Sequence, residues 1–151
     1  LKNTDQFENN FFELLENLIP DEKNEIINIV IFCKTNEVKV KFEWLENEIK
    51  TRTKKITGYD PNVTLITSVR IHDRSILTNH MYINSGDTFN NYFYPVTKKL
   101  KTRGDFIVFN SLARINHYNH YFKILDKYQE ILNEKSTLIE GAKVCKFLNF
   151  P

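Results

Sequence analysis

Residues 25–33, EIINIVIFC, constrain the fold more than any other segment, because they form an apolar, largely β-branched run of strand length. A strand that is apolar on both faces is typical of a sheet that is covered on both sides. Residues 38–54 combine a strand-like start with helical spacing of apolar side chains, and a second strand-length run occupies residues 63–69. Two parallel strands need a long crossover between them, so we predict a helix over residues 38–54 and a βαβ unit.

Other segments add further helices and strands to this unit. Apolar periodicity predicts helices over residues 7–19 and 114–135, and short apolar or alternating runs predict strands over residues 70–78, 80–85 and 105–110. On the longer helix one apolar stripe is expected, made up of Ile115, Tyr118, Phe122, Leu125, Tyr128 and Leu132. The predicted fold class is therefore α/β, with a mixed central sheet flanked by helices on both faces.

Length and composition fit a single domain over residues 1–151, since no repeat, linker or composition shift divides the chain. The longest apolar runs are far shorter than the ~20 residues that span a bilayer, so no transmembrane segment is expected. Cys33 and Cys145 are too few for a disulfide framework or a zinc site, and we expect thiols of a cytoplasmic protein. A formal net charge of +2 does not by itself imply a nucleic-acid partner.

Residues 71–90, IHDRSILTNHMYINSGDTFN, concentrate polar side chains around short apolar runs. On a strand, residues two apart point to the same face, so His72 and Arg74 are expected to project together and to contact one phosphate. A simpler interpretation is a polar hairpin on a half-exposed sheet, with Asn79 at its turn and Gly86 ending the second strand.

The spacing of this stretch resembles the HKD signature of the phospholipase D superfamily, H-x-K-x4-D-x6-G-S-x2-N, with every interval intact. Three positions match, namely His72, Gly86 and Asn90. Three positions differ: Arg74 replaces lysine, Asn79 replaces aspartate and Asp87 replaces serine. The resemblance covers about 20 of the 151 residues, and the same form is similar to the phospholipase D-like C-terminal domain attached to MIT domains, which is regarded as non-catalytic and membrane-binding.

This resemblance implies one half of a phospholipase D-like fold and a chemistry that needs neither metal nor cofactor. In the family, one histidine attacks phosphorus and the histidine of a second motif copy protonates the leaving group. His72 would be the nucleophile of an active protein, with Arg74 and Asn90 binding phosphate and Asn79, Gly86 and Asp87 supporting them. The chain carries one motif copy, so a complete site would require a homodimer about a two-fold axis.

The substitutions favour a domain without catalysis. The planar fork of Arg74 does not replace a lysine point charge, Asn79 removes a carboxylate, and Asp87 places negative charge near an approaching phosphate. We therefore expect a catalytically degenerate domain, one module of a longer protein, that binds an anion (a phosphodiester, nucleic acid or acidic lipid) or another protein. The alternative is a homodimeric, metal-independent phosphodiesterase or nuclease that uses His72.

Weaker signals lie elsewhere in the chain. The basic clusters at residues 50–55 and 98–103 are candidate anion-binding surfaces, although charge runs of this kind are usually only solvated. Two histidines, His117 and His120, lie near Tyr121 at helical spacing, and a solvated helix face is favoured there over a metal site.

Overall fold

The protein was analysed as a computed structural model that describes residues 7–19, 26–35, 40–72, 74–78, 81–85, 107–111 and 113–151. The chain divides into two compact units. One unit contains Leu1–Ile71 together with Gln129–Pro151, and the other contains His72–Tyr128. Compact units of this kind can share one domain, so the single domain expected from the sequence stays a prediction.

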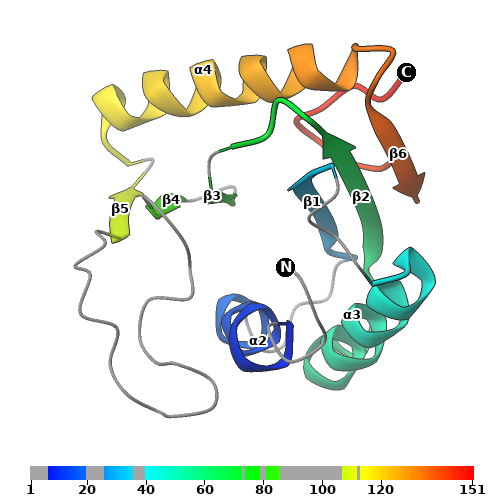
Figure 1. Cartoon of the computed structure of the whole chain (residues 1–151). Coiled ribbons are helices and arrows are strands. Elements are labelled where there is room, and N and C mark those ends of the chain that lie inside the picture. The colour runs from blue at the N-terminus through cyan, green and yellow to red at the C-terminus, as the bar shows by residue number, and fades with distance from the viewer. Residues whose placement is uncertain are drawn as a thin grey trace, which may run out of the picture. The chain divides into compact units, whose positions relative to one another are not determined.

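The first unit contains the predicted βαβ arrangement (Figure 1). Strand β1 (Asn28–Lys34) runs parallel to β2 (Asn62–Ser68), with Asn28 opposite Asn62 and Lys34 opposite Ser68. Helix α3 (Phe42–Thr57) makes the crossover between them. A third strand, β6 (Leu138–Gly141), pairs antiparallel with the other edge of β2, giving a mixed sheet in the order β1-β2-β6.

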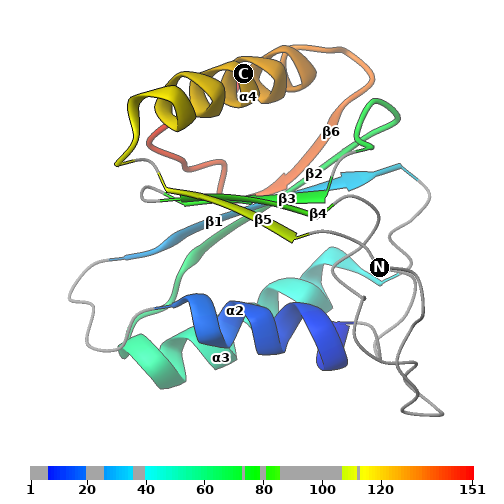
Figure 2. The same ribbon diagram turned by 90° about the vertical axis from the view of Figure 1, so that its left-hand side faces the viewer.

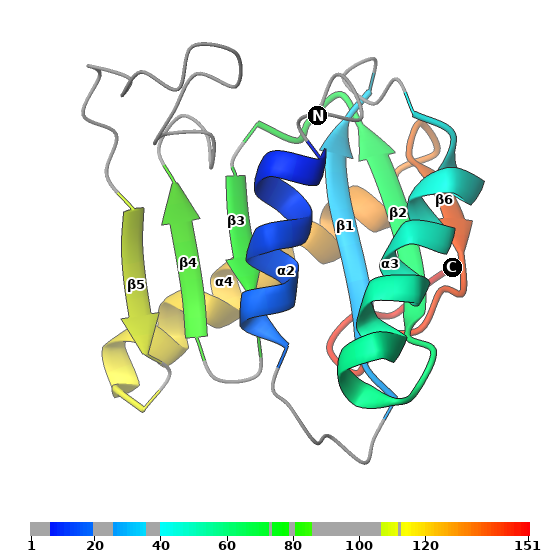
Figure 3. The same ribbon diagram turned by 90° about the horizontal axis from the view of Figure 1, so that it is seen from below.

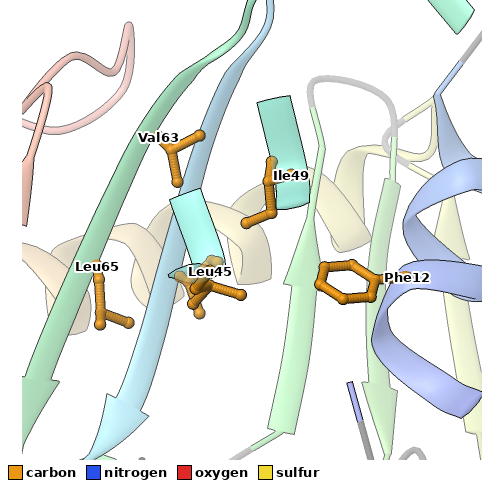
Figure 4. Close-up of a cluster of buried hydrophobic side chains, with 6 residues drawn as sticks. Phe12, Leu45, Ile49, Val63 and Leu65 are labelled. Atoms are coloured by element: carbon orange, nitrogen blue, oxygen red, sulfur yellow. The ribbon is translucent and has the colours of Figure 1, made fainter. Parts of the chain in front are cut away.

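Helices cover one face of this sheet (Figure 2). The predicted helix over residues 7–19 is present as a π-helical start, η1 (Phe7–Phe12), that continues into α2 (Glu13–Leu18). Both α2 and α3 lie on the same side of β1 and β2. The core between these elements is apolar, and Figure 4 draws its six buried residues, all but Ile31 labelled: Phe12, Ile31, Leu45, Ile49, Val63 and Leu65.

The second unit contains an antiparallel sheet in the order β3-β4-β5 (Figure 3). Its strands are β3 (Arg74–Leu77), β4 (Met81–Ser85) and β5 (Ile107–Ser111). Helix α4 (Ile115–Leu132) follows β5 and contributes its residues up to Tyr128 to this unit. A hydrogen bond of 2.8 Å joins the Tyr128 hydroxyl to Ser75 Oγ, and the Tyr82 and His120 rings meet edge to face at 5.6 Å. These contacts hold α4 against the sheet.

The α/β class and a mixed sheet are confirmed, but the described strands pair in two sets of three and not in one central sheet. The strand predicted over residues 70–78 also begins later, at Arg74. Its start is displaced because the Ser68 hydroxyl accepts a hydrogen bond from the Arg70 amide, which makes a turn directly after β2. No helix in the described part of the chain is both long enough and apolar enough to cross a membrane.

Candidate anion site at one end of the second sheet

The two leading site residues lie on either side of a strand boundary. His72 is exposed and lies in irregular chain just before β3, whereas Arg74 is the first residue of β3 and pairs with Ser85 of β4. The expectation that both side chains project from one strand is therefore wrong for His72, because the turn after β2 delays the start of the strand. The two residues are still neighbours along the backbone at the same end of the sheet.

Strand register places Ser85, the last described residue before Gly86, at this end. Ser85 pairs with Arg74 on one side and with Ile107 on the other. The two described residues on either side of the 86–106 connection, Ser85 and Ile107, therefore lie at the Arg74 end of the sheet. That connection includes three signature positions and the second basic cluster, all outside the described residues: Gly86, Asp87, Asn90 and residues 98–103.

Asn79, another signature position, lies outside the described residues. The described residues on either side of residues 79–80, Thr78 and Met81, pair with each other. The Thr78 amide donates to the Met81 carbonyl at 2.9 Å, and the Met81 amide donates to Thr78 Oγ1 at 3.0 Å. At about 3.3 Å per strand residue, roughly 13 Å separates Thr78 from Arg74. The pair Thr78 and Met81 therefore lies at the end of the hairpin away from Arg74.

The exposed imidazole of His72 is accessible to a ligand from solution. It can donate a hydrogen bond to a phosphate oxygen or attack as a nucleophile. A nucleophilic histidine also needs a group that fixes its tautomer and orientation, commonly a carboxylate. Within the described residues, no hydrogen bond or ion pair to His72 supplies that group.

The first basic cluster, residues 50–55 on α3, is divided between two faces of the helix. Lys50 pairs with Glu46 at 2.7 Å and Lys54 pairs with Asp60 at 2.9 Å. These lysines lie in an open depression of about 560 Å³ that is lined by Asn47, Lys50, Thr51, Lys54, Lys55 and Asp60. The exposed pairs contribute little to stability and partly neutralise the surface, so this depression is a weaker anion site than the cluster's charge suggests.

Arg52, in the middle of the same cluster, has a structural role instead. Its guanidinium hydrogen-bonds Glu16 at 2.8 Å and Glu8 at 2.6 Å, and it lies over the Phe12 ring at 4.4 Å from the centroid. Glu48 approaches Nε at 3.5 Å, too far for a well-formed hydrogen bond. The hydrogen bond to Glu16 raises the pKa of Arg52 above its ordinary value. The sequence alone does not reveal this role, because two of the partners lie 36 and 44 residues away.

The other residue types considered for metal binding do not form a cluster in the described residues. His120 is exposed and contacts the Tyr82 ring, while the side chain of His117 lies outside what the structure describes. Within the described residues, Cys33 and Cys145 are not joined in a disulfide. In the part of the chain that is described, no three His, Cys, Asp or Glu side chains lie close enough to hold a metal ion.

The chain was also compared with known proteins. No family model, no curated protein and no solved structure matches it. The class that the described residues define is α/β with two three-stranded sheets, and the function must be argued from the residues themselves.

Proposed function

We propose that this chain is a catalytically degenerate, phospholipase D-like module of a cytoplasmic protein that binds a phosphate-bearing anion. His72, Arg74 and Asn90 would contact the anion. The observation that carries the proposal is the pairing of Ser85 with both Arg74 and Ile107, because it brings the ends of the 86–106 connection to the His72 end of the sheet.

Electrostatics supports an anion as the ligand. Arg74 can donate two parallel hydrogen bonds to phosphate, and the 86–106 connection also carries the basic cluster at residues 98–103. Asp87 opposes this charge and limits affinity. The ligand class is therefore a phosphodiester, a nucleic acid or an acidic lipid headgroup, all of which present the same phosphate oxygens.

Loss of catalysis follows from the groups around His72. The chain has asparagine at position 79 where the resembled signature has aspartate, so the carboxylate of the signature is missing. A histidine without a carboxylate partner is poorly stabilised in the charged form that phosphoryl transfer produces. We therefore expect binding without measurable turnover.

One observation favours a second candidate function, a homodimeric and metal-independent phosphodiesterase or nuclease. His72 is exposed, so the imidazoles of two copies can meet across a two-fold axis and act as nucleophile and general acid. Hydrolysis of bis(p-nitrophenyl) phosphate in the presence of EDTA, abolished by His72→Ala, would establish this function.

The binding proposal is tested by titrating the full chain with inorganic pyrophosphate and following backbone amide resonances by NMR. We expect shifts at residues 72–77 and at Ser85, with weaker binding in His72→Ala and in Arg74→Ala. Lys55→Ala is the matched control, since Lys55 is an exposed cation of the other unit. Equal binding by the wild type and both site variants would contradict the proposal.

A further inference from the structure

Helix α4 carries a second apolar stripe, which the β3-β4-β5 sheet does not cover. Its residues are Ile115, Tyr118 and Phe122, whose side chains are 71%, 45% and 41% exposed. The Tyr118 and Phe122 rings meet edge to face with their centroids 4.7 Å apart. We call these three residues the exposed stripe.

Helix geometry explains why the exposed stripe exists. In an α-helix successive residues are about 100° apart, so the exposed stripe is centred roughly 90° around the helix from Tyr121, Leu125 and Tyr128. Those three side chains are buried. The sequence predicts one stripe that merges both sets, and the expectation that Ile115, Tyr118 and Phe122 belong to the buried face is wrong. The apolar face of α4 is therefore wider than the part of that face that is buried against the rest of the protein.

The charges at the two ends of the exposed stripe are opposite. Arg114 immediately precedes the stripe and Asp126 lies one turn beyond Phe122. Both side chains are exposed, and within the described residues neither has an ion-pair partner. A stripe that is positive at one end and negative at the other is complementary to itself when turned end to end.

We propose that the exposed stripe is the contact surface for a second copy of this chain, with the two α4 helices packed antiparallel. A two-fold axis on the side of the exposed stripe, at the level of residue 120 along α4, places Tyr118 opposite Phe122 of the partner subunit, because the two numbers sum to twice 120. The same axis places Arg114 opposite Asp126 of the partner subunit, and symmetry makes each contact twice. Aromatic residues and arginine are the types that dominate the energetics of protein interfaces.

The small size of the exposed stripe sets the affinity. Stable interfaces bury about 1,200–2,000 Å² in total, which three side chains from each copy do not reach alone. We therefore expect concentration-dependent association with a dissociation constant on the order of 100 µM. This proposal does not rest on the anion site, and its variants leave that site unchanged.

The test is a charge swap measured by sedimentation equilibrium of the full chain. Arg114→Asp and Asp126→Arg are each expected to weaken self-association about tenfold, because each places like charges opposite one another. The double variant restores the attraction and should dimerise as the wild type does. Arg114 directly precedes the first residue of α4, where aspartate is a favoured capping residue, so Arg114→Asp is expected to fold.

Two further variants complete the design. Phe122→Glu places a charge in the exposed stripe and should leave the protein monomeric, whereas Lys135→Glu, an exposed charge beyond the C-terminal end of α4, should change nothing. A wild-type protein that stays monomeric up to about 1 mM overturns the proposal. The proposal is also overturned, in favour of a membrane surface as the partner, if the wild type is monomeric and sediments with phosphatidylcholine vesicles while Phe122→Glu does not. Pyrophosphate titration of the same variants tests the anion site independently.

Discussion

Asp87 is the signature position whose side-chain charge most directly opposes the proposed ligand. Replacement by serine, the residue of the resembled signature, removes one negative charge near the phosphate position. Two charges about 4 Å apart in water interact by about 1 kcal/mol, so we expect Asp87→Ser to bind pyrophosphate roughly fivefold more tightly. Isothermal titration calorimetry at low salt would measure the change. Unchanged or weaker binding would show that residue 87 does not face the anion.

Arg52 illustrates how a residue in a basic cluster can stabilise the fold instead of binding a ligand. Its bonds to Glu8 and Glu16 and its position over Phe12 tie η1 and α2 to α3. Exposed ion pairs and a cation–π contact are each worth about 0.5–1 kcal/mol, so Arg52→Ala should lower the free energy of unfolding by about 2 kcal/mol. Urea denaturation provides the measurement, with Lys55→Ala as a control expected to change it by less than about 0.5 kcal/mol.

Thr53 and Thr57 form a matched pair one turn apart on α3, both of them buried. Thr57 Oγ1 donates to the Thr53 carbonyl at 3.0 Å and accepts from the Tyr59 amide at 3.2 Å. Thr53 Oγ1 is buried with no hydrogen-bond partner in the described structure. Valine has nearly the same shape, so Thr53→Val should stabilise and Thr57→Val should destabilise, each by about 1 kcal/mol. Thermal denaturation measures both changes, and melting temperatures of the two variants that shift in the same direction would refute this explanation.

At the scale of the element, two glycines with positive φ angles should respond differently to alanine. Gly58 (φ 79°) ends α3, its amide donates to the Lys54 carbonyl at 2.8 Å, and a Cβ there would meet open space. Gly141 (φ 97°) lies in β6, where a Cβ would clash with the Val63 carbonyl oxygen and lie 2.7 Å from the Phe42 ring.

We therefore expect Gly58→Ala to cost about 1 kcal/mol, the strain of a left-handed residue alone. Gly141→Ala should cost about 3 kcal/mol or more, because β6 must move away from β2. Chemical denaturation distinguishes the two, and equal losses would mean that β6 does not pack as closely as the structure shows.

The elements that the sequence predicts correctly are those with long, unambiguous apolar patterns. The strands now called β1 and β2 and the helix α3 between them follow from residue periodicity and the geometry of parallel crossovers. Strand β6 is missed because its four residues include only two apolar side chains, and its pairing with β2 is long-range. The early start predicted for β3 fails because one hydroxyl, that of Ser68, makes a local turn.

At the scale of the whole molecule, the sequence names candidate site residues but does not show which of them lie together. Spacing alone groups His72 with Arg74 on one strand, while the turn after β2 leaves His72 outside β3. The roles of Arg52 and of the exposed stripe depend on packing between segments far apart in the chain. Such information is absent from a local motif.

The two compact units separate the residues of the proposed functions from the stabilising residues discussed above. The anion site and the exposed stripe both belong to the unit of residues 72–128, whereas Arg52 and the buried threonines stabilise the other unit. Variants designed for stability should therefore leave pyrophosphate binding unchanged at temperatures where the protein is folded.

A crystal structure of the full chain grown with inorganic pyrophosphate tests the central claim most directly. We predict that His72, Arg74 and Asn90 converge on one bound phosphate, with Asn79 turned away from it at the opposite end of the hairpin. Side chains of His72 and Arg74 on unrelated surfaces, or pyrophosphate bound only at the lysines of α3, would contradict the account.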